Sequence, residues 1–213
     1  MNITSLTVIF DIDGVIVDSE KLHYEVLQAW VPGHIQHYTP QQLIGLSLEE
    51  TLSFIGIAAC SHPDIIARVV DTYKDLLTPQ ALRPGVRDLI HRLHQQGIAF
   101  GFVSTAPRHI CLANLALLQL DAPVQLIGGD DIARTKPFPD PYLEMLSRLN
   151  ADAKKTVVIE DTDLGIAAAH QAGIAQIYAW PHALSDQQQY LQASAVIASL
   201  QDIAEFSQLN LIQ

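Results

Sequence analysis

The apolar positions of this chain fall into short runs rich in β-branched residues, each bounded by glycine, proline or polar residues. Such runs are typical of strands that are buried on both faces of a sheet. They occur at residues 6–10, 98–103, 124–127, 156–159 and 174–179. The pattern therefore predicts five buried strands.

Between these runs, apolar residues recur at the spacing of an amphipathic helix. The helical stretches lie at residues 86–96, 107–118, 139–149 and 164–172. Gly97 and Gly173 follow the first and the last of them, as glycine commonly does at the end of a helix. Strands that alternate with helices predict an α/β fold, with a parallel sheet and helices on both faces.

A long stretch without strand signals separates the first expected strand from the second. Helical spacing continues there through residues 19–30, 40–46, 48–55 and 63–76. Ser47 and Glu50 have the spacing of a capping box, and Thr39 before Pro40 is typical of a helix start. We expect a small helical domain at residues 17–82, inserted into a core formed by residues 1–16 and 83–213.

Composition limits the classes of partner. The chain has 213 residues, of which 49% are hydrophobic, and a formal net charge of −11. It lacks the clustered positive charge that nucleic acid or an anionic membrane requires. No apolar run reaches the ~18 residues of a membrane-spanning helix, and we expect no signal peptide. Cys60 and Cys111 have no metal or redox spacing, which favours a reducing cytoplasm.

Two carboxylates follow the first expected strand directly, at Asp11 and Asp13. The period of a strand places both side chains on the same side. Carboxylates held close together repel one another, so they are tolerated where a cation lies between them or where one is protonated. The pair is therefore a candidate metal or acid–base site, and the alternative is a turn with solvated acids.

A second polar segment follows the second expected strand. Ser104 and Thr105 precede a helix whose first turn holds Pro107. Backbone N–H groups at a helix N-terminus bind anions readily. The two residues are candidates for phosphate binding, although an ordinary helix cap is the favoured interpretation when this segment is taken alone.

Lys136 lies in a proline-rich segment, in which Pro137, Pro139 and Pro141 occupy alternate positions. These prolines restrict the backbone of the loop and thereby the direction of the lysine side chain. An ammonium group is a compact charge suited to phosphate or to paired carboxylates. The segment suggests a positioned charge, and the alternative is a solvated lysine beside a turn.

The fourth expected strand again ends in acidic residues, Glu160 and Asp161, which Asp163 follows. A cap on the next helix is the simple interpretation of Asp161 or Asp163. All four polar segments, however, lie at or just past the carboxyl ends of expected parallel strands. Because ligands bind at this edge of open α/β sheets, we expect the four segments to form one site.

These segments, in this order and with a helical insertion after the first, resemble the haloacid dehalogenase superfamily of phosphohydrolases. The resemblance covers nearly the whole chain and implies a Rossmann-like core with a helical cap. The group that contains beta-phosphoglucomutase and many sugar-phosphate phosphatases is the most similar. Shorter matches to this group are the segment 14–20 leading to His23, Gly45 with Ser47, Lys136 with Pro137, and the segment 167–173.

The resemblance implies roles for the first two acids. Asp11 would be the nucleophile that forms an aspartyl-phosphate. Asp13 would be the general acid and base, which protonates the leaving oxygen and then activates water. Dehalogenases and phosphonatases of the superfamily do not keep the second acid, so the presence of Asp13 favours a phosphatase.

The resemblance also implies a Mg²⁺ cofactor, which would neutralise the repulsion between the nucleophile and phosphate. Its ligands would be Asp11, the backbone carbonyl of Asp13, and Asp161, with Glu160 close by. Ser104, the backbone amide of Thr105 and Lys136 would hold the transferred phosphoryl group. Thr105 stands where relatives often have Asn or Ser, which matters little for a backbone donor.

One departure from this group concerns the cap. Beta-phosphoglucomutase carries a lysine just before the glycine matched by Gly45 and an arginine just after the serine matched by Ser47, and both bind a second phosphate. Here those positions are Ile44 and Leu48. The loss of both cations favours hydrolysis of a monophosphate over mutase chemistry.

The sequence thus predicts a cytoplasmic, Mg²⁺-dependent phosphomonoester hydrolase for a small phosphorylated metabolite, with a sugar phosphate favoured by the resemblance. Lys21 and His23, at the start of the cap, are the candidates for contacts with the leaving group. A phosphomutase and a non-catalytic phosphate-binding protein are the alternatives. We expect no nucleic-acid or membrane partner, and a monomer is favoured although the sequence does not determine the oligomeric state.

Overall fold

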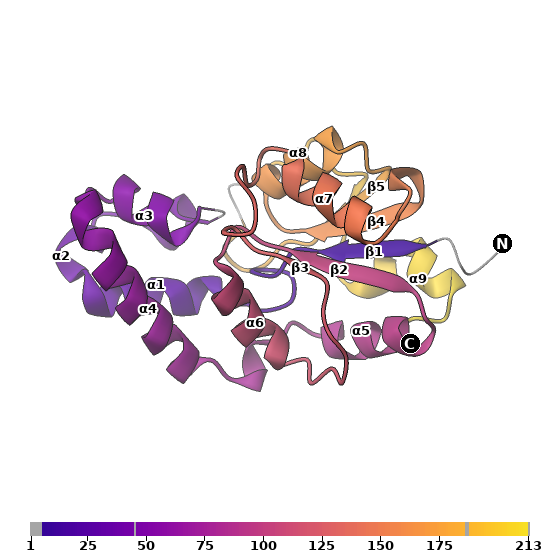
Figure 1. Ribbon diagram of the computed structural model, residues 1–213, viewed down its shortest axis with the longest axis horizontal. Helices are drawn as coiled ribbons and strands as arrows, with labels where there is room; N and C mark the ends of the chain where they lie inside the picture. The colour runs from indigo at the N-terminus through magenta and orange to yellow at the C-terminus, as the bar shows by residue number, and fades with distance from the viewer. Residues whose placement is uncertain (1–5, 45, 186–187, 213) are drawn as a thin grey trace.

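The computed structural model describes residues 6–44, 46–185 and 188–212. Its strands form one sheet in the order β3-β2-β1-β4-β5-β6, and every neighbouring pair is parallel. The strands are β1 (Thr7–Phe10), β2 (Ala99–Val103), β3 (Leu126–Ile127), β4 (Thr156–Glu160), β5 (Gln176–Ala179) and β6 (Ala195–Val196). The order places β1 between β2 and β4, so the carboxyl ends of these three strands lie side by side (Figure 1).

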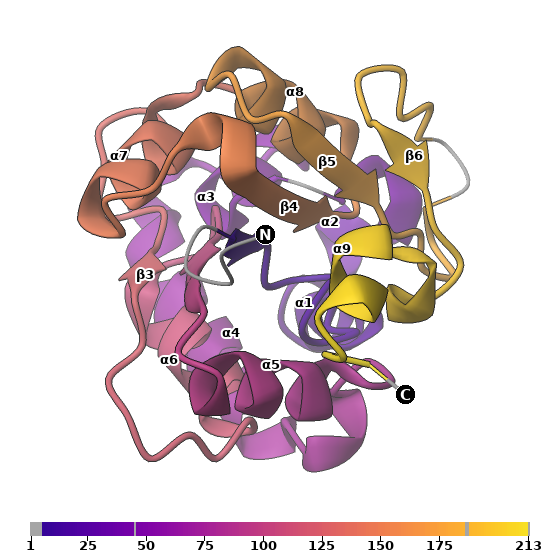
Figure 2. The same ribbon diagram turned by 90° about the vertical axis from the view of Figure 1, so that its right-hand side faces the viewer.

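Helices cover both faces of the sheet because successive side chains of each strand point to opposite faces. Val8 and Phe10 of β1 pack into one apolar cluster, and Ile9 packs into another. On the first side lie α5 (Val86–Gln95), α6 (Arg108–Ala116) and α9 (Ala204–Gln208). On the second side lie α7 (Asp140–Arg148) and α8 (Asp163–Gln171), as the view along the strands shows (Figure 2). The predicted α/β fold is confirmed.

The chain between β1 and α5 is helical and lies to one side of the sheet (Figure 1). Its helices are α1 (Glu20–Trp30), α2 (Pro32–Ile35), α3 (Leu48–Phe54) and α4 (His62–Leu76). They enclose an apolar cluster of their own, which includes Val26, Ile35, Leu52 and Val69. The predicted helical insertion is therefore confirmed.

The two connections between this helical part and the sheet run next to each other. Val17 and Leu82 form an antiparallel bridge. The Asp18 amide donates to the Ala81 carbonyl at 2.7 Å, and the Arg83 amide donates to the Ile16 carbonyl at 3.0 Å. This pairing agrees with domain boundaries at 16/17 and 82/83, which stay a prediction.

One expected helix is wrong. In place of a helix over residues 40–46, the structure has a single 3₁₀ turn, Pro40–Gln42. The Thr39 amide donates to Gln42 Oε1 at 2.9 Å in a capping box, which stabilises the start of this turn. Gly45 lies outside the described residues. The start of the next helix is as predicted, because the Ser47 amide donates to Glu50 Oε2 at 2.8 Å in a capping box.

The sequence pattern also missed some short elements. These are β6, α2 and α9, together with the 3₁₀ turns Ala59–Ser61, Pro79–Ala81, Ala153–Lys155 and Leu200–Asp202. Both residues of β6 are exposed, so this strand produces no apolar run. Within the described ranges, no helix is both long and apolar enough to cross a membrane.

Leu52 tests whether the helical part has an independent core, since its side chain is fully buried in that cluster. We expect Leu52→Ala to destabilise the protein by about 2–5 kcal/mol through the cavity it leaves. Hydrogen exchange should accelerate in α1, α3 and α4 while the amides of β1 and β4 keep their protection. Leu93→Ala is the control. Leu93 packs in the apolar cluster that contains Val8 and Phe10 of β1, so this variant should accelerate exchange in the strands. Equal acceleration in both parts by Leu52→Ala would contradict an independent core.

Candidate active site

The strand register brings three of the expected segments to the same level. Phe10 of β1 lies opposite Phe102 of β2 and Ile159 of β4. Asp11 therefore leaves β1 beside Glu160, the last residue of β4, while Ser104 follows the end of β2. The structure thus brings the polar residues that follow these strands to one edge of the sheet.

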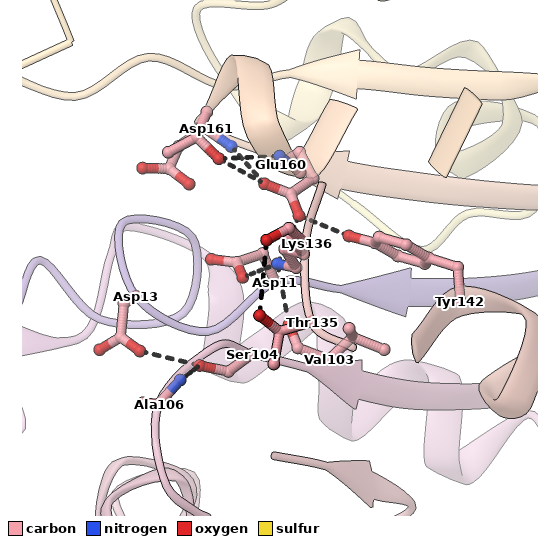
Figure 3. A network of polar contacts seen from close by, with 12 residues as sticks. Asp11, Asp13, Val103, Ser104, Ala106, Thr135, Lys136, Tyr142, Glu160 and Asp161 are labelled. Carbon is pink, nitrogen blue, oxygen red and sulfur yellow. Dashed lines mark hydrogen bonds and ion pairs between the residues drawn. The ribbon is translucent and has the colours of Figure 1, made fainter. Parts of the chain in front are cut away.

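Lys136 lies at the centre of this edge (Figure 3). Its Nζ forms a very short contact with Asp11 Oδ1, and donates to Glu160 Oε1 at 2.6 Å and to the Val103 carbonyl at 3.2 Å. Burial alone would lower the pKa of Lys136, but the Asp11 and Glu160 carboxylates outweigh burial and raise it. Lys136 is therefore a fixed positive charge.

Glu160 is fully buried, and its carboxylate is held by several donors. Tyr142 donates from Oη to Glu160 Oε1 at 2.5 Å, in addition to the contact from Lys136. Gly165 of α8 packs against the same carboxylate: a Cβ there would come within 2.0 Å of it. Tyr142 was not predicted as a site residue, because an aromatic residue at helical spacing is indistinguishable from a core residue in the sequence.

Three acids form a candidate metal site. Ligand oxygens of Asp11, Glu160 and Asp161 lie within 4.8 Å of one another, and all three side chains are buried. Both carboxylate oxygens of Asp161 lack a hydrogen-bond donor among the described residues, although His182 Nε2 lies 3.1 Å from one of them. Buried carboxylates without donors are costly unless a cation compensates them. The residues present therefore fit a bound metal ion.

The backbone beside this cluster leaves no room for another side chain. Gly14 has a φ of +85°, and a Cβ at this position would lie 2.2 Å from Asp161 Oδ2. Burial raises the pKa of Asp161, against the opposing effect of His182. Burial, together with the carboxylates of Glu160 and Asp161, also raises the pKa of Asp11 despite Lys136. A cation between these acids would relieve this repulsion.

Asp13 faces away from the acid cluster. Ser19 Oγ and Asn114 Nδ2 donate to Asp13 Oδ1 at 2.7 and 3.2 Å, and Ser104 Oγ donates to Oδ2 at 3.1 Å. The Asp13 side chain is not part of the cluster of three acids. A metal contact from Asp13 would come from its backbone carbonyl, as the sequence predicts.

A cavity of about 930 Å³, including its opening to solvent, lies between this edge and the helical part. Its floor contains Asp11, Asp13, Ser104, Thr105, Lys136 and Asp161. Ser104 is buried, and its Oγ accepts a hydrogen bond from the Ala106 amide at 2.9 Å. All four segments singled out in the sequence thus contribute residues to one cavity.

The two expected leaving-group contacts differ in placement. His23 lines the cavity, and its buried Nε2 has no hydrogen-bond partner among the described residues. Burial lowers the pKa of His23. The structure does not bring Lys21 to the cavity: its side chain is 80% exposed and lies 3.6 Å from Glu25. The reason is helical geometry, because residues two apart do not share a face of a helix.

Glu20 is a cavity residue that the sequence prediction missed. Its carboxylate makes no hydrogen bond or ion pair with any described residue. Burial raises its pKa well above the ordinary value, and the carboxylates of Asp161, Asp13 and Asp18 add to this shift. The spacing could have identified it, since Glu20 precedes His23 by three residues on the same face of α1.

The family model of haloacid dehalogenase-like hydrolases matches residues 8–179, which include every site segment described above. The chain belongs to this family. The prediction of a phosphatase-like hydrolase of the haloacid dehalogenase type is confirmed.

Relatives of this haloacid dehalogenase-like hydrolase carry several activities in their names. The chain is 31% identical to a phosphorylated carbohydrates phosphatase of Thermotoga maritima, over 89% of this chain and 91% of that protein. It is 30% identical to a phosphoglycolate phosphatase of Xanthomonas campestris, over 84% and 85%. The crystal structure of beta-phosphoglucomutase from Clostridium difficile shares the fold, with a TM-score of 0.77 at 21% identity over 98% and 97%.

Glu20 provides a test of the charge balance in the cavity. An acid whose pKa is raised in the folded state destabilises the protein as the pH rises from the ordinary pKa, which is 4.5 for Glu20, through the pKa of the folded state. We therefore expect Glu20→Gln to raise the free energy of unfolding of the metal-free protein at neutral pH and to have little effect below pH 4.5. Urea unfolding in EDTA measures both values.

The matched control for this prediction is Glu25→Gln, an exposed acid on the same helix. It should leave the unfolding free energy nearly unchanged at both pH values, since exposed ion pairs contribute ~0–1 kcal/mol. A Glu20→Gln protein that is less stable than the wild type at neutral pH would show that an unseen partner stabilises the carboxylate.

Proposed function

We propose that this hydrolase is a Mg²⁺-dependent phosphomonoester hydrolase that acts on a small phosphorylated metabolite through an aspartyl-phosphate. The observation that carries the proposal is the placement of Asp11, whose carboxylate contacts Lys136 and belongs to the cluster with Glu160 and Asp161. A nucleophile, a fixed cation and a cation site thus meet at the floor of one cavity. The name of the Thermotoga relative favours a sugar phosphate as substrate.

In the first step, a carboxylate oxygen of Asp11 attacks the phosphorus atom, and the bond between phosphorus and the leaving oxygen breaks. Asp13 lines the same cavity and donates a proton to the leaving oxygen. Lys136 balances charge beside the nucleophile, while Ser104 and the Thr105 amide hold the phosphoryl oxygens.

In the second step, a water molecule attacks the phosphorus atom of the aspartyl-phosphate. Asp13, now deprotonated, accepts the proton of this water. The bond between phosphorus and the Asp11 oxygen breaks, which releases inorganic phosphate and restores the carboxylate. Both steps use the same pair of acids, in agreement with their placement along one short loop.

Asp11, the backbone carbonyl of Asp13, and Asp161 would hold the Mg²⁺ ion, with Glu160 behind them in contact with Lys136. When bound, Mg²⁺ supplies positive charge that offsets the repulsion between the carboxylates and the phosphate. The hard oxygen ligands favour Mg²⁺ over softer metals.

The helical part, proposed as residues 17–82, serves as a cap over the cavity. Its paired connections near Ile16 and Leu82 are the proposed hinges. Closure would exclude bulk water and strengthen the electrostatic contacts with the phosphate. The cytoplasmic location and the monomeric state stay predictions.

A phosphomutase is less well supported than a hydrolase. Leu48 lines the cavity, at a position where a cation would be needed to hold a second phosphate. Ile44 is buried and does not line the cavity. A bisphosphate intermediate would therefore lack this pair of cations during its reorientation.

Asp11→Asn tests the nucleophile, because an amide of nearly the same shape cannot attack phosphorus. We expect release of inorganic phosphate from sugar phosphates and an aryl phosphate to fall by about 10³-fold or more. EDTA should abolish the wild-type activity, and Mg²⁺ should restore it. Retained activity in the variant would contradict the proposed nucleophile, whereas isomerised sugar phosphate in place of phosphate release would indicate a mutase.

A further inference from the structure

The wall of the cavity opposite the acid cluster is largely apolar. The side chains that the helical part contributes include Leu27, Leu43, Leu46, Leu48, Val69 and Val70. Among the described lining residues, Lys136 is the only lysine or arginine, and it is already engaged by Asp11 and Glu160. The space above the nucleophile therefore offers no positive side chain to a ligand.

Polar groups on this side remain available, among them those of Glu20 and His23. The Glu20 carboxylate makes no hydrogen bond with a described residue, and the buried Nε2 of His23 has no partner there either. The hydroxyls of the cavity tyrosines are occupied, since Tyr24 donates to the Tyr38 carbonyl at 2.7 Å and Tyr73 donates to Asn114 Oδ1 at 2.7 Å. An acidic group and an imidazole suit hydroxyl groups of a ligand.

We propose that the leaving group of the substrate is uncharged, so that the substrate is a monophosphate ester of a neutral alcohol without a carboxylate or a second phosphate. A buried anion without a compensating cation is costly, and Glu20 would repel it. A neutral polyol would place hydroxyls at Glu20 and His23 and its carbon face against the leucines. This inference rests on the proposed phosphohydrolase function.

An uncharged leaving group agrees with one of the activities named among the relatives and disagrees with another. The leaving group of phosphoglycolate carries a carboxylate, which this apolar wall does not accommodate. The neutral leaving group of a carbohydrate monophosphate fits it. The similarity to phosphoglycolate phosphatase therefore does not extend to the leaving group.

Matched substrate pairs test the inference on the wild-type enzyme with Mg²⁺. One pair is 2-hydroxyethyl phosphate and phosphoglycolate, which differ in a neutral hydroxymethyl and a carboxylate; the other is glucose 6-phosphate and glucose 1,6-bisphosphate. We expect kcat/KM for the neutral member to exceed that of the anionic member by about tenfold or more. Equal or faster turnover of the anionic members would overturn the inference about the leaving group but not the proposed function. Failure with all four and with an aryl phosphate would overturn the proposed function as well.

Leu48 offers a second test because its side chain lines the wall. Leu48→Arg should shift the kcat/KM ratio toward the anionic members, while Leu48→Met, which adds no charge, should keep the preference of the wild type. A Leu48→Met protein whose ratio shifts as far as that of Leu48→Arg would overturn the electrostatic cause. Circular dichroism establishes that both variants are folded.

A different observation concerns Asp13. Tyr73 of α4 donates to Asn114 Oδ1, and Asn114 Nδ2 donates to Asp13 Oδ1 at 3.2 Å. Tyr73 and Asn114 are both fully buried. Because the Asn114 carbonyl oxygen faces Tyr73, its amide nitrogen is turned toward Asp13. A chain of buried hydrogen bonds thus connects the helical part to the second acid.

We infer that Tyr73 and Asn114 are positioning residues, which hold the Asp13 carboxyl in place when the helical part lies over the cavity. Neither residue contacts the acid cluster, and each acts through its neighbour in the chain. Substitution of either residue should therefore slow the reaction of those substrates whose leaving group needs the proton that Asp13 delivers. This inference also rests on the proposed hydrolysis.

Leaving groups of different basicity separate positioning from general stability. An alkyl phosphate such as glycerol phosphate needs a proton on its leaving oxygen, whereas 4-nitrophenyl phosphate does not. We expect Asn114→Leu to lower kcat/KM for the alkyl substrate by about tenfold. The aryl substrate should change by less than about twofold, because kcat/KM covers only the steps up to the phospho-enzyme. Tyr73→Phe should give the same pattern with a smaller amplitude.

A purely structural role would lower kcat/KM for both substrates by the same factor, and that result would overturn the inference. Addition of Asn114→Leu to Asp13→Asn should lower the alkyl rate no further, because residues that act as a unit are not additive. A further loss of about tenfold in this double variant would also contradict positioning through Asp13.

Discussion

The site depends on the buried arrangement of Lys136 between Asp11 and Glu160. The ammonium group balances part of the charge that β1 and β4 bring together, and Tyr142 donates a further hydrogen bond to Glu160. One lysine does not compensate three buried acids, and neither Asp161 oxygen accepts a hydrogen bond from a described residue, although His182 Nε2 lies 3.1 Å from one of them. The site therefore still needs positive charge, which a divalent cation would supply. With that cation bound, a phosphoryl group fits the same place.

The parallel sheet supplies the rigidity for this arrangement. Its central strands are fully buried and paired in register, so Asp11 and Glu160 are fixed by backbone hydrogen bonds and not by flexible loops. Arg83, which follows the second connection to the helical part, donates to the carbonyls of Gly14 at 2.5 Å and Trp180 at 2.9 Å. The connection is thereby tied to the loop that carries Asp13, which relates the position of the helical part to the acids.

The sequence predicted the parts of the molecule that follow from local pattern. Buried strands that end in acids, such as the run before Asp11, identified the edge of the sheet and the residues on its floor. Contacts across the chain could not be predicted in this way. Asn114 lies in the middle of an amphipathic helix, and its role depends on Tyr73, 41 residues away, which no local period reveals. Lys21 is a candidate because of its place at the start of the cap, but its side chain on α1 is 80% exposed and lies beside Glu25.

Covalent transfer of the phosphoryl group to Asp11 can be observed directly. Wild-type enzyme with Mg²⁺ and an aryl phosphate is quenched in acid during turnover, reduced with borohydride and digested for mass spectrometry. Borohydride converts an aspartyl-phosphate to homoserine and leaves free carboxylates unchanged. We predict this conversion at Asp11, with Asp13 and Asp161 intact. Steady release of phosphate with Asp11 unmodified, or conversion at another acid, would contradict a reaction through Asp11.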